Sequence, residues 1–224
     1  MEIGRGNVVP ALVSHTTDGS RTVSVAHDHG GFGPYTMDDL HAREDEGRGL
    51  ELEDGWLVEL SPSAPHNWAA MRLQEIFNAA AVDAGATVFV AGGGEWEIST
   101  PAGIRKPDVF MVPRSVARRS IVDRDPAVIP GGELLVVVEV VSPGSGSERT
   151  DRVRKLKEYA ALGIPQYWLV EFSPHPRVRV FTLDDGAGAY LSHAAAEAGE
   201  VLKVEVQADS AFTVTFDPGT LTEF

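Results

Sequence analysis

The sequence predicts an α/β domain with a central mixed β-sheet, helices on its faces and β-hairpins at its C-terminal end. Three observations indicate this fold class. Residues 134–141 form an apolar run between two glycines and a Ser-Pro-Gly turn, which is typical of a strand buried on both faces. A helix and a second strand follow this run. After Pro176 the chain continues as short alternating segments, which are typical of hairpins.

The composition allows one substantial domain. The chain has 224 residues, of which 43% are hydrophobic. No apolar stretch approaches the roughly 20 residues of a membrane span, and the first residues lack the features of a signal peptide. We therefore expect a cytoplasmic protein without membrane contact. Because the chain has no cysteine, disulfides and thiolate metal sites are excluded, and hard-metal chemistry with oxygen ligands remains.

The chain divides into an N-terminal extension, residues 1–33, and one domain, residues 34–224. The extension is rich in Gly, Ser, Thr and His and has no sustained helical or strand period. It contains His27-Asp28-His29, which could be read as a metal clip. An unsupported His-x-His in such a segment is more often a solvated loop, and we interpret it as one.

The first half of the domain contains well-marked local signals. Thr36 is placed to cap a short helix, and Asp54-Gly55 is placed to turn a hairpin over residues 50–60. A longer helix is expected to start at Ser63 or Pro65-His66 and to stop at Gly85. Two strands, over residues 87–91 and 95–99, should follow it.

The second half contains the strands that matter most for function. One strand begins at Asp108, the next contains Glu139, and a polar loop separates them. A helix over residues 148–162 and a strand over residues 166–172 come next. A right-handed crossover of this kind makes the strands on either side of the helix parallel. Hairpin strands are then expected over residues 177–183, 189–192, 201–206 and 212–216.

Glu139 is the most informative residue, because a charge within a buried apolar strand costs several kcal/mol unless it is paired. A metal ion is a natural partner, and Asp108 at the start of the preceding strand provides a second carboxylate. In nucleases of the PD-(D/E)XK type, a lysine stands two residues after such an acid. Here that position is Val141, so the positive charge must come from elsewhere.

The helix after the Glu139 strand offers a replacement lysine. Winding residues 151–163 at about 100° per residue predicts a buried stripe of Val153, Leu156 and Ala160. Lys155 then lies beside Tyr159 on one flank, and Lys157 lies on the other flank, roughly 160° away. Only one lysine can be catalytic, and we expect Lys155 to extend from its flank towards the carboxylates.

The net charge of −14 argues against a nucleic-acid enzyme, because phosphate contacts depend on clustered Lys and Arg. The distribution of charge weakens this objection. Basic residues gather over residues 105–119 and 149–157, on either side of the predicted site. We therefore expect DNA binding to be weak, or to depend on a local basic patch.

Several segments together resemble the Uma2 family, also called DUF820. They are Glu51-Leu52-Glu53-Asp54-Gly55, the His66 helix, Lys106-Pro107-Asp108-Val109, Val138-Glu139-Val140-Val141-Ser142-Pro143 and residues 155–168. The resemblance runs from about Tyr35 to the C-terminus and implies a restriction-endonuclease-like core. It also implies that Asp108 and Glu139 match the metal-binding acids, that Lys155 matches a migrated lysine and that Glu51 matches an N-terminal acid.

The implied activity is that of a metal-dependent endonuclease acting on DNA. Asp108, Glu139 and the Val140 carbonyl would hold Mg²⁺, with Mn²⁺ as an alternative. The ion would activate a water that Lys155 orients or deprotonates. Dimerisation through an exposed hairpin edge is a further expectation.

Other readings of the same residues remain open. Asp108 alone could cap backbone amides, Glu139 could form a structural ion pair with a helix Arg or Lys, and Lys155 could be a solvated surface lysine. Glu51 could merely support the hairpin, and we expect His66 to make only a contact at a helix start. The corresponding functions are a nuclease-fold binding protein without activity, which the acidic charge favours, and a phosphoesterase acting on a non-nucleic substrate.

Overall fold

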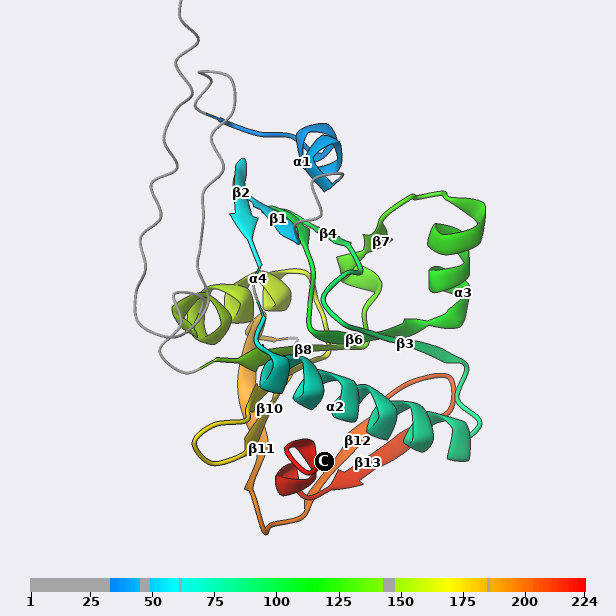
Figure 1. Ribbon diagram of the computed structural model, residues 1–224. Helices are drawn as coiled ribbons and strands as arrows, with labels where there is room; N and C mark the ends of the chain where they lie inside the picture. The colour runs from blue at the N-terminus through cyan, green and yellow to red at the C-terminus, as the bar shows by residue number, and fades with distance from the viewer. Residues whose placement is uncertain (1–32, 45–48, 61, 143–147, 185) are drawn as a thin grey trace, which may run out of the picture.

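The computed structural model describes residues 33–44, 49–60, 62–142, 148–184 and 186–224. The predicted extension, with His27-Asp28-His29, therefore lies outside the described residues except for Gly33. The α/β class predicted from the sequence is confirmed (Figure 1).

A six-stranded mixed sheet forms the centre of the fold, in the order β11-β10-β9-β8-β6-β3. Its strands are β3 (Val88–Gly92), β6 (Val109–Pro113), β8 (Val136–Val141), β9 (Gln166–Glu171), β10 (Arg177–Asp184) and β11 (Ala189–Glu197). Strands β8 and β9 are parallel, as the predicted crossover requires, and the other neighbours are antiparallel. All six residues of β8 are buried, so Glu139 lies within a strand that is covered on both faces.

Helices cover the two faces of this sheet. Helix α2 (Ala64–Asp83) begins after the N-cap Ser63, as predicted, and packs Leu73 and Phe77 against one face. The other face is covered by a π-helix, η3 (Thr150–Lys155), which continues into α4 (Leu156–Ala161). The hairpin β12 (Leu202–Val206) and β13 (Phe212–Phe216) joins the core on the α2 side, before the terminal turn η4 (Pro218–Leu221).

A second sheet, in the order β2-β1-β5-β4-β7, lies beside the central one (Figure 1). Its strands are β1 (Leu50–Glu53), β2 (Trp56–Glu59), β4 (Ile98–Thr100), β5 (Gly103–Arg105) and β7 (Ile129–Pro130). The turn between β1 and β2 has positive φ at Asp54 and Gly55, so the predicted hairpin is confirmed. Helix α1 (Met37–Glu44) starts with the predicted Thr36 cap, whose Oγ accepts a hydrogen bond from the Asp39 amide at 3.3 Å.

Several local predictions were wrong or incomplete. The strand expected over residues 95–99 is β4, which begins only at Ile98, and β5 was not predicted. The loop between the two acidic strands contains α3 (Arg114–Arg118), a short π-helix η1 (Arg119–Asp123) and a 3-10 helix η2 (Gly131–Glu133). These elements are short, and their stability comes from tertiary packing. They therefore leave no hydrophobic period in the sequence from which they could be predicted.

The predicted buried stripe of the later helix was partly wrong: Ala160 is buried and Leu156 packs against the core, but Val153 does not belong to the buried face. Val153 is 47% exposed, whereas Asp151, Lys155, Tyr159 and Ala160 are buried. The prediction assumed α-helical winding, but residues 150–155 form a π-helix, in which each residue advances through a smaller angle. The helix therefore turns a polar stripe towards the interior, where it meets the acids described below.

None of the helices in the described part of the chain has the length and apolar character that a membrane crossing requires.

Candidate active site

Asp108 and Glu139 meet across two neighbouring antiparallel strands. In the β6–β8 ladder, Val109 pairs with Val138, so the next positions outward, Asp108 and Glu139, stand opposite each other and share a face. Both are buried, with 8% and 2% of their surface exposed. The structure thus brings together the two acids that the sequence singled out.

Asp108 is held from two directions. Its Oδ2 accepts a hydrogen bond from the Val140 amide at 2.7 Å and lies 3.2 Å from Nε2 of His66. His66 is in the first turn of α2, is 2% exposed and meets the ring of Phe172 edge to face. The sequence reasoning underestimated His66, because its contact with Asp108 arises only where the start of α2 lies against the start of β6.

Both carboxylate oxygens of Glu139 have partners from the helix that follows its strand. Lys155 Nζ donates to Oε2 at 2.9 Å, and the Tyr159 hydroxyl donates to Oε1 at 2.8 Å. Lys155 is 2% exposed, so it does not extend from a solvated flank but belongs to the buried side of the helix. The solvated-lysine reading is therefore wrong, whereas the catalytic role of Lys155 stays a prediction.

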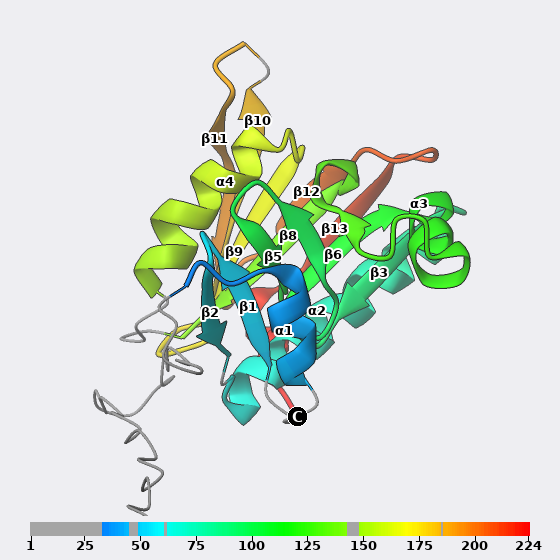
Figure 2. The same ribbon diagram turned by 90° about the horizontal axis from the view of Figure 1, so that it is seen from above.

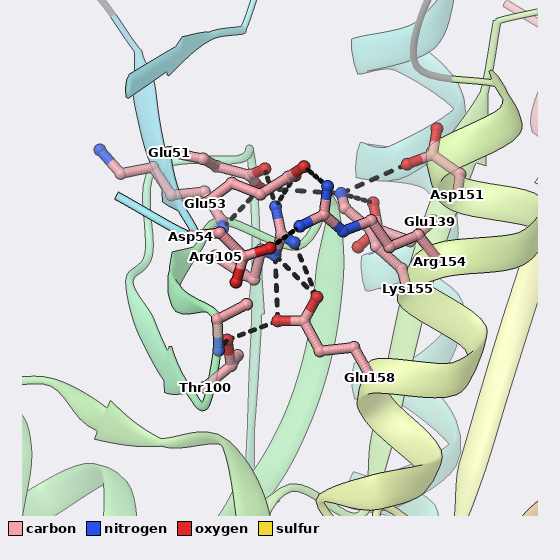
Figure 3. Close-up of polar contacts among 12 residues, drawn as sticks. Glu51, Glu53, Asp54, Thr100, Arg105, Glu139, Asp151, Arg154, Lys155 and Glu158 are labelled. Atoms are coloured by element: carbon pink, nitrogen blue, oxygen red, sulfur yellow. Dashed lines mark hydrogen bonds and ion pairs between the residues drawn. The ribbon is translucent and has the colours of Figure 1, made fainter. Parts of the chain in front are cut away.

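Two further carboxylates surround the same ammonium group (Figure 3). Lys155 Nζ lies 3.3 Å from Oδ1 of Asp151 and 3.7 Å from Oε1 of Glu51. Glu51 Oε1 also accepts a hydrogen bond from the Lys106 amide at 2.8 Å. Asp151, which is 1% exposed, was missed, because α-helical winding did not place it on the buried face.

Burial and like charges perturb the ionisation of this cluster. Burial raises the pKa of Glu139 to about 8; the nearby Lys155 ammonium opposes this rise, and the charges of Asp108, Asp151 and Glu51 add to it. Burial, followed by the negative charge of Glu139, raises the pKa of Tyr159 well above its usual value. The phenol therefore keeps its proton and acts as a hydrogen-bond donor.

Arg105 ties the hairpin to the helix on one side of this cluster (Figure 3). Its guanidinium is fully buried, lies 2.7 Å from Glu158 and 3.4 Å from Glu51, and also pairs with Glu53. Burial alone would lower the pKa of Arg105, but the hydrogen bonds to Glu158 and the charges of Glu51 and Glu158 reverse this effect and raise it. The exposed Arg154 bonds the same hairpin at Glu53 and Asp54. These pairs hold Glu51 and the Lys155 helix in a fixed relation.

The donor atoms suit a hard divalent cation. Among the described residues, no group of three or more His, Asp or Glu side chains is arranged as a metal site. Mg²⁺ does not require such a group, because it is usually bound by one or two carboxylates and keeps several waters. Asp108 and Glu139 supply two carboxylates. The Val140 carbonyl faces the same neighbouring strand as the Val140 amide, which bonds Asp108.

A mixed sheet with two opposed buried acids, and a lysine from the next helix against one of them, defines a protein of the nuclease-fold class. The chain belongs to the Uma2 family, whose model matches residues 37–215 and is described as "Putative restriction endonuclease". The resemblance stated from the sequence is thereby confirmed.

One solved structure, "a putative nuclease belonging to DUF820" from Anabaena variabilis, is similar over 84% of this chain and 98% of its own, with 14% identity and a TM-score of 0.58. At this identity the similarity shows the fold alone. A search of curated proteins found no match.

Proposed function

We propose that this protein is a Mg²⁺-dependent nuclease that hydrolyses phosphodiester bonds in DNA. The observation that carries the proposal is the buried pair of opposed acids, Asp108 and Glu139, with Lys155 Nζ 2.9 Å from Glu139. Membership of the Uma2 family and the nuclease fold support the same class of activity.

The residues have distinct proposed roles. Asp108 and Glu139, with the Val140 carbonyl, would hold the ion, which when bound polarises a phosphate oxygen and lowers the pKa of a coordinated water. Lys155 would orient the attacking water or neutralise charge that develops on the phosphate. Tyr159 positions Glu139 through its Oε1, and His66 positions Asp108 through its Oδ2. Glu51 would act as a further acid that helps to place the Lys155 ammonium.

One observation favours a second candidate, a nuclease-fold binding protein without activity. Both oxygens of Glu139 already have protein partners, as they would in a purely structural ion pair. The two functions differ in the uptake of a divalent ion. A nuclease must bind the ion at Asp108 and Glu139, whereas a structural pair need not.

Purified protein should be incubated with DNA in the presence of Mg²⁺ or Mn²⁺, and ion binding should be measured by calorimetry. We expect cleavage with either ion, and loss of both cleavage and ion uptake in Asp108→Asn and Glu139→Gln. Asp83→Asn, at the exposed end of α2, is a matched acid-to-amide control that should retain both. A wild-type protein that takes up no divalent ion and cuts no DNA would refute the proposal and leave the binding protein.

A further inference from the structure

A hollow lies outside the carboxylate cluster, between α1 and the loop after η1. We call it the α1–η1 cleft. It has a volume of about 480 Å³, and its lining includes His41, Trp96, Glu97, Ser120 and Arg124. The helices on its two sides flank strands β4 and β7 (Figure 1). This volume is within the range of about 300–1,000 Å³ that is usual for ligand sites.

A chain of polar contacts joins this cleft to the carboxylate cluster. Glu97 pairs through Oε2 with His41 at 2.8 Å and through Oε1 with Lys106 Nζ at 3.7 Å. The Lys106 amide donates in turn to Glu51, which belongs to the cluster. Lys106 is thus the single residue between the cleft lining and Glu51 of the cluster.

Trp96 provides a fixed aromatic surface in the cleft. Its ring meets Phe89 edge to face, with centroids 5.3 Å apart and an interplanar angle of 77°. The indole is partly exposed and lines the cleft. A ring held in this way can stack on a nucleobase, and such stacking contributes about 1–3 kcal/mol per base.

The continuous helical segment formed by α3, η1 and Arg124 provides positive charge beside the cleft. Arg118, Arg119 and Arg124 are exposed on this segment, which begins at α3 (Figure 2). Within the described ranges, Arg118 and Arg124 form no ion pair, and Arg119 reaches only Glu133, at 4.0 Å. In the other basic segment, Arg152 and Arg154 are paired with acids, whereas the exposed Arg149 and Lys157 form no ion pair with the described residues. The acids Glu95 and Glu97 also line the cleft, so Arg124 is the lining residue that offers positive charge to an anionic ligand.

Arg124 also has an unusual backbone. It ends η1 in the left-handed region, with φ 54° and ψ 37°, which costs a non-glycine residue roughly 1–2 kcal/mol. Such strained conformations cluster at ligand clamps. Here the conformation occurs in a residue that lines the cleft and whose guanidinium forms no ion pair with any described residue.

We infer that the α1–η1 cleft binds one unpaired nucleotide of single-stranded DNA, with its base against Trp96 and a phosphate at Arg124. The inference rests on the proposed function, from which it takes DNA as the polymer. A base in a duplex is stacked on both faces and cannot meet an indole, whereas an unpaired base can. The cleft would therefore hold a nucleotide close to the bond that is cut and would favour single-stranded substrates.

The test is the binding of a short fluorescein-labelled oligothymidylate, followed by anisotropy in EDTA so that no cleavage occurs. We expect Trp96→Ala and Arg124→Asn to weaken binding about tenfold or more. Asn suits the left-handed backbone at position 124, and Arg124→Lys, which keeps the charge, should retain most of the affinity. Trp56→Ala and Lys203→Asn change an exposed Trp and an exposed Lys outside the cleft and should bind like the wild type.

The inference is overturned if the cleft variants bind like the wild type, or if a duplex of the same length binds as tightly as the single strand. Tighter binding of oligouridylate than of oligothymidylate would overturn the assignment to DNA. Because the assay needs neither metal nor cleavage, it separates the cleft from the proposed activity.

Discussion

Replacing the buried Arg105 should be far more damaging than replacing its exposed counterpart, Arg154. Arg105 has no exposed surface, and its guanidinium partly balances the negative charges of Glu51, Glu53 and Glu158. Arg105→Met leaves these carboxylates without their common guanidinium, and breaking a buried pair in this way costs about 3–5 kcal/mol. The free energy of unfolding of an ordinary domain is about 5–15 kcal/mol, so Arg105→Met removes a large share of the stability. We expect about 3 kcal/mol, because Glu53 keeps Arg154 and Glu158 keeps Thr100 as partners.

Arg154→Met is the matched control. It removes an arginine that bonds the same Glu53, but its side chain is 42% exposed, and pairs of this kind contribute about 0–1 kcal/mol. The free energy of unfolding should be measured in urea by circular dichroism. Adding Glu158→Gln to Arg105→Met should recover part of the loss, because it removes a stranded charge. If Arg105→Met costs no more than Arg154→Met, the reasoning about the buried network is refuted.

Three further predictions concern the acids, the lysine and the second sheet. The pKa of Glu139 is raised from its usual value of 4.5 to about 8, so the folded protein holds the Glu139 proton more tightly than the unfolded chain does. The stabilisation that this proton gives is therefore full below pH 4.5 and is lost as the pH rises through about 8. In metal-free protein, the unfolding free energy should therefore fall by up to about 1.4 kcal/mol per pH unit across this window, and urea titrations of Glu139→Gln should lack that part of the slope. Lys155→Met should reduce DNA cleavage at least about 100-fold while leaving oligonucleotide binding in EDTA unchanged, and cleavage within a few-fold of the wild type would exclude a catalytic Lys155. Gly103→Ala should lower the unfolding free energy by roughly 1–3 kcal/mol, because φ is +138° and the new Cβ would lie 2.4 Å from the Leu52 carbonyl; a change within the error of the urea measurement would contradict the close approach of β5 and β1.

Dimerisation through a hairpin edge and the binding of DNA stay predictions. The sheet order leaves β11 and β3 at the edges of the central sheet, so an edge contact is open to direct test by measuring the molar mass in solution.

The sequence by itself determined the elements that depend on local signals. The burial of the strand around Glu139, the Asp54-Gly55 turn, the Thr36 and Ser63 caps and the parallel crossover were all predicted from period, capping and turn chemistry. These signals are local because the backbone conformation of a turn or cap depends on a few neighbouring residues. The convergence of Asp108, Glu139 and Lys155 was also anticipated, although their roles stay predictions.

Only the tertiary structure decided which other charged groups join these three. His66 reaches Asp108, Asp151 reaches Lys155, and Arg105 reaches Glu158 across 53 positions of sequence. Such contacts depend on how helices cross strands and on the π-helix η3, which rotates one helix face, and neither leaves a period in the sequence. A buried charge is stable only where the fold supplies its partner, so the identity of that partner is a property of the packed chain.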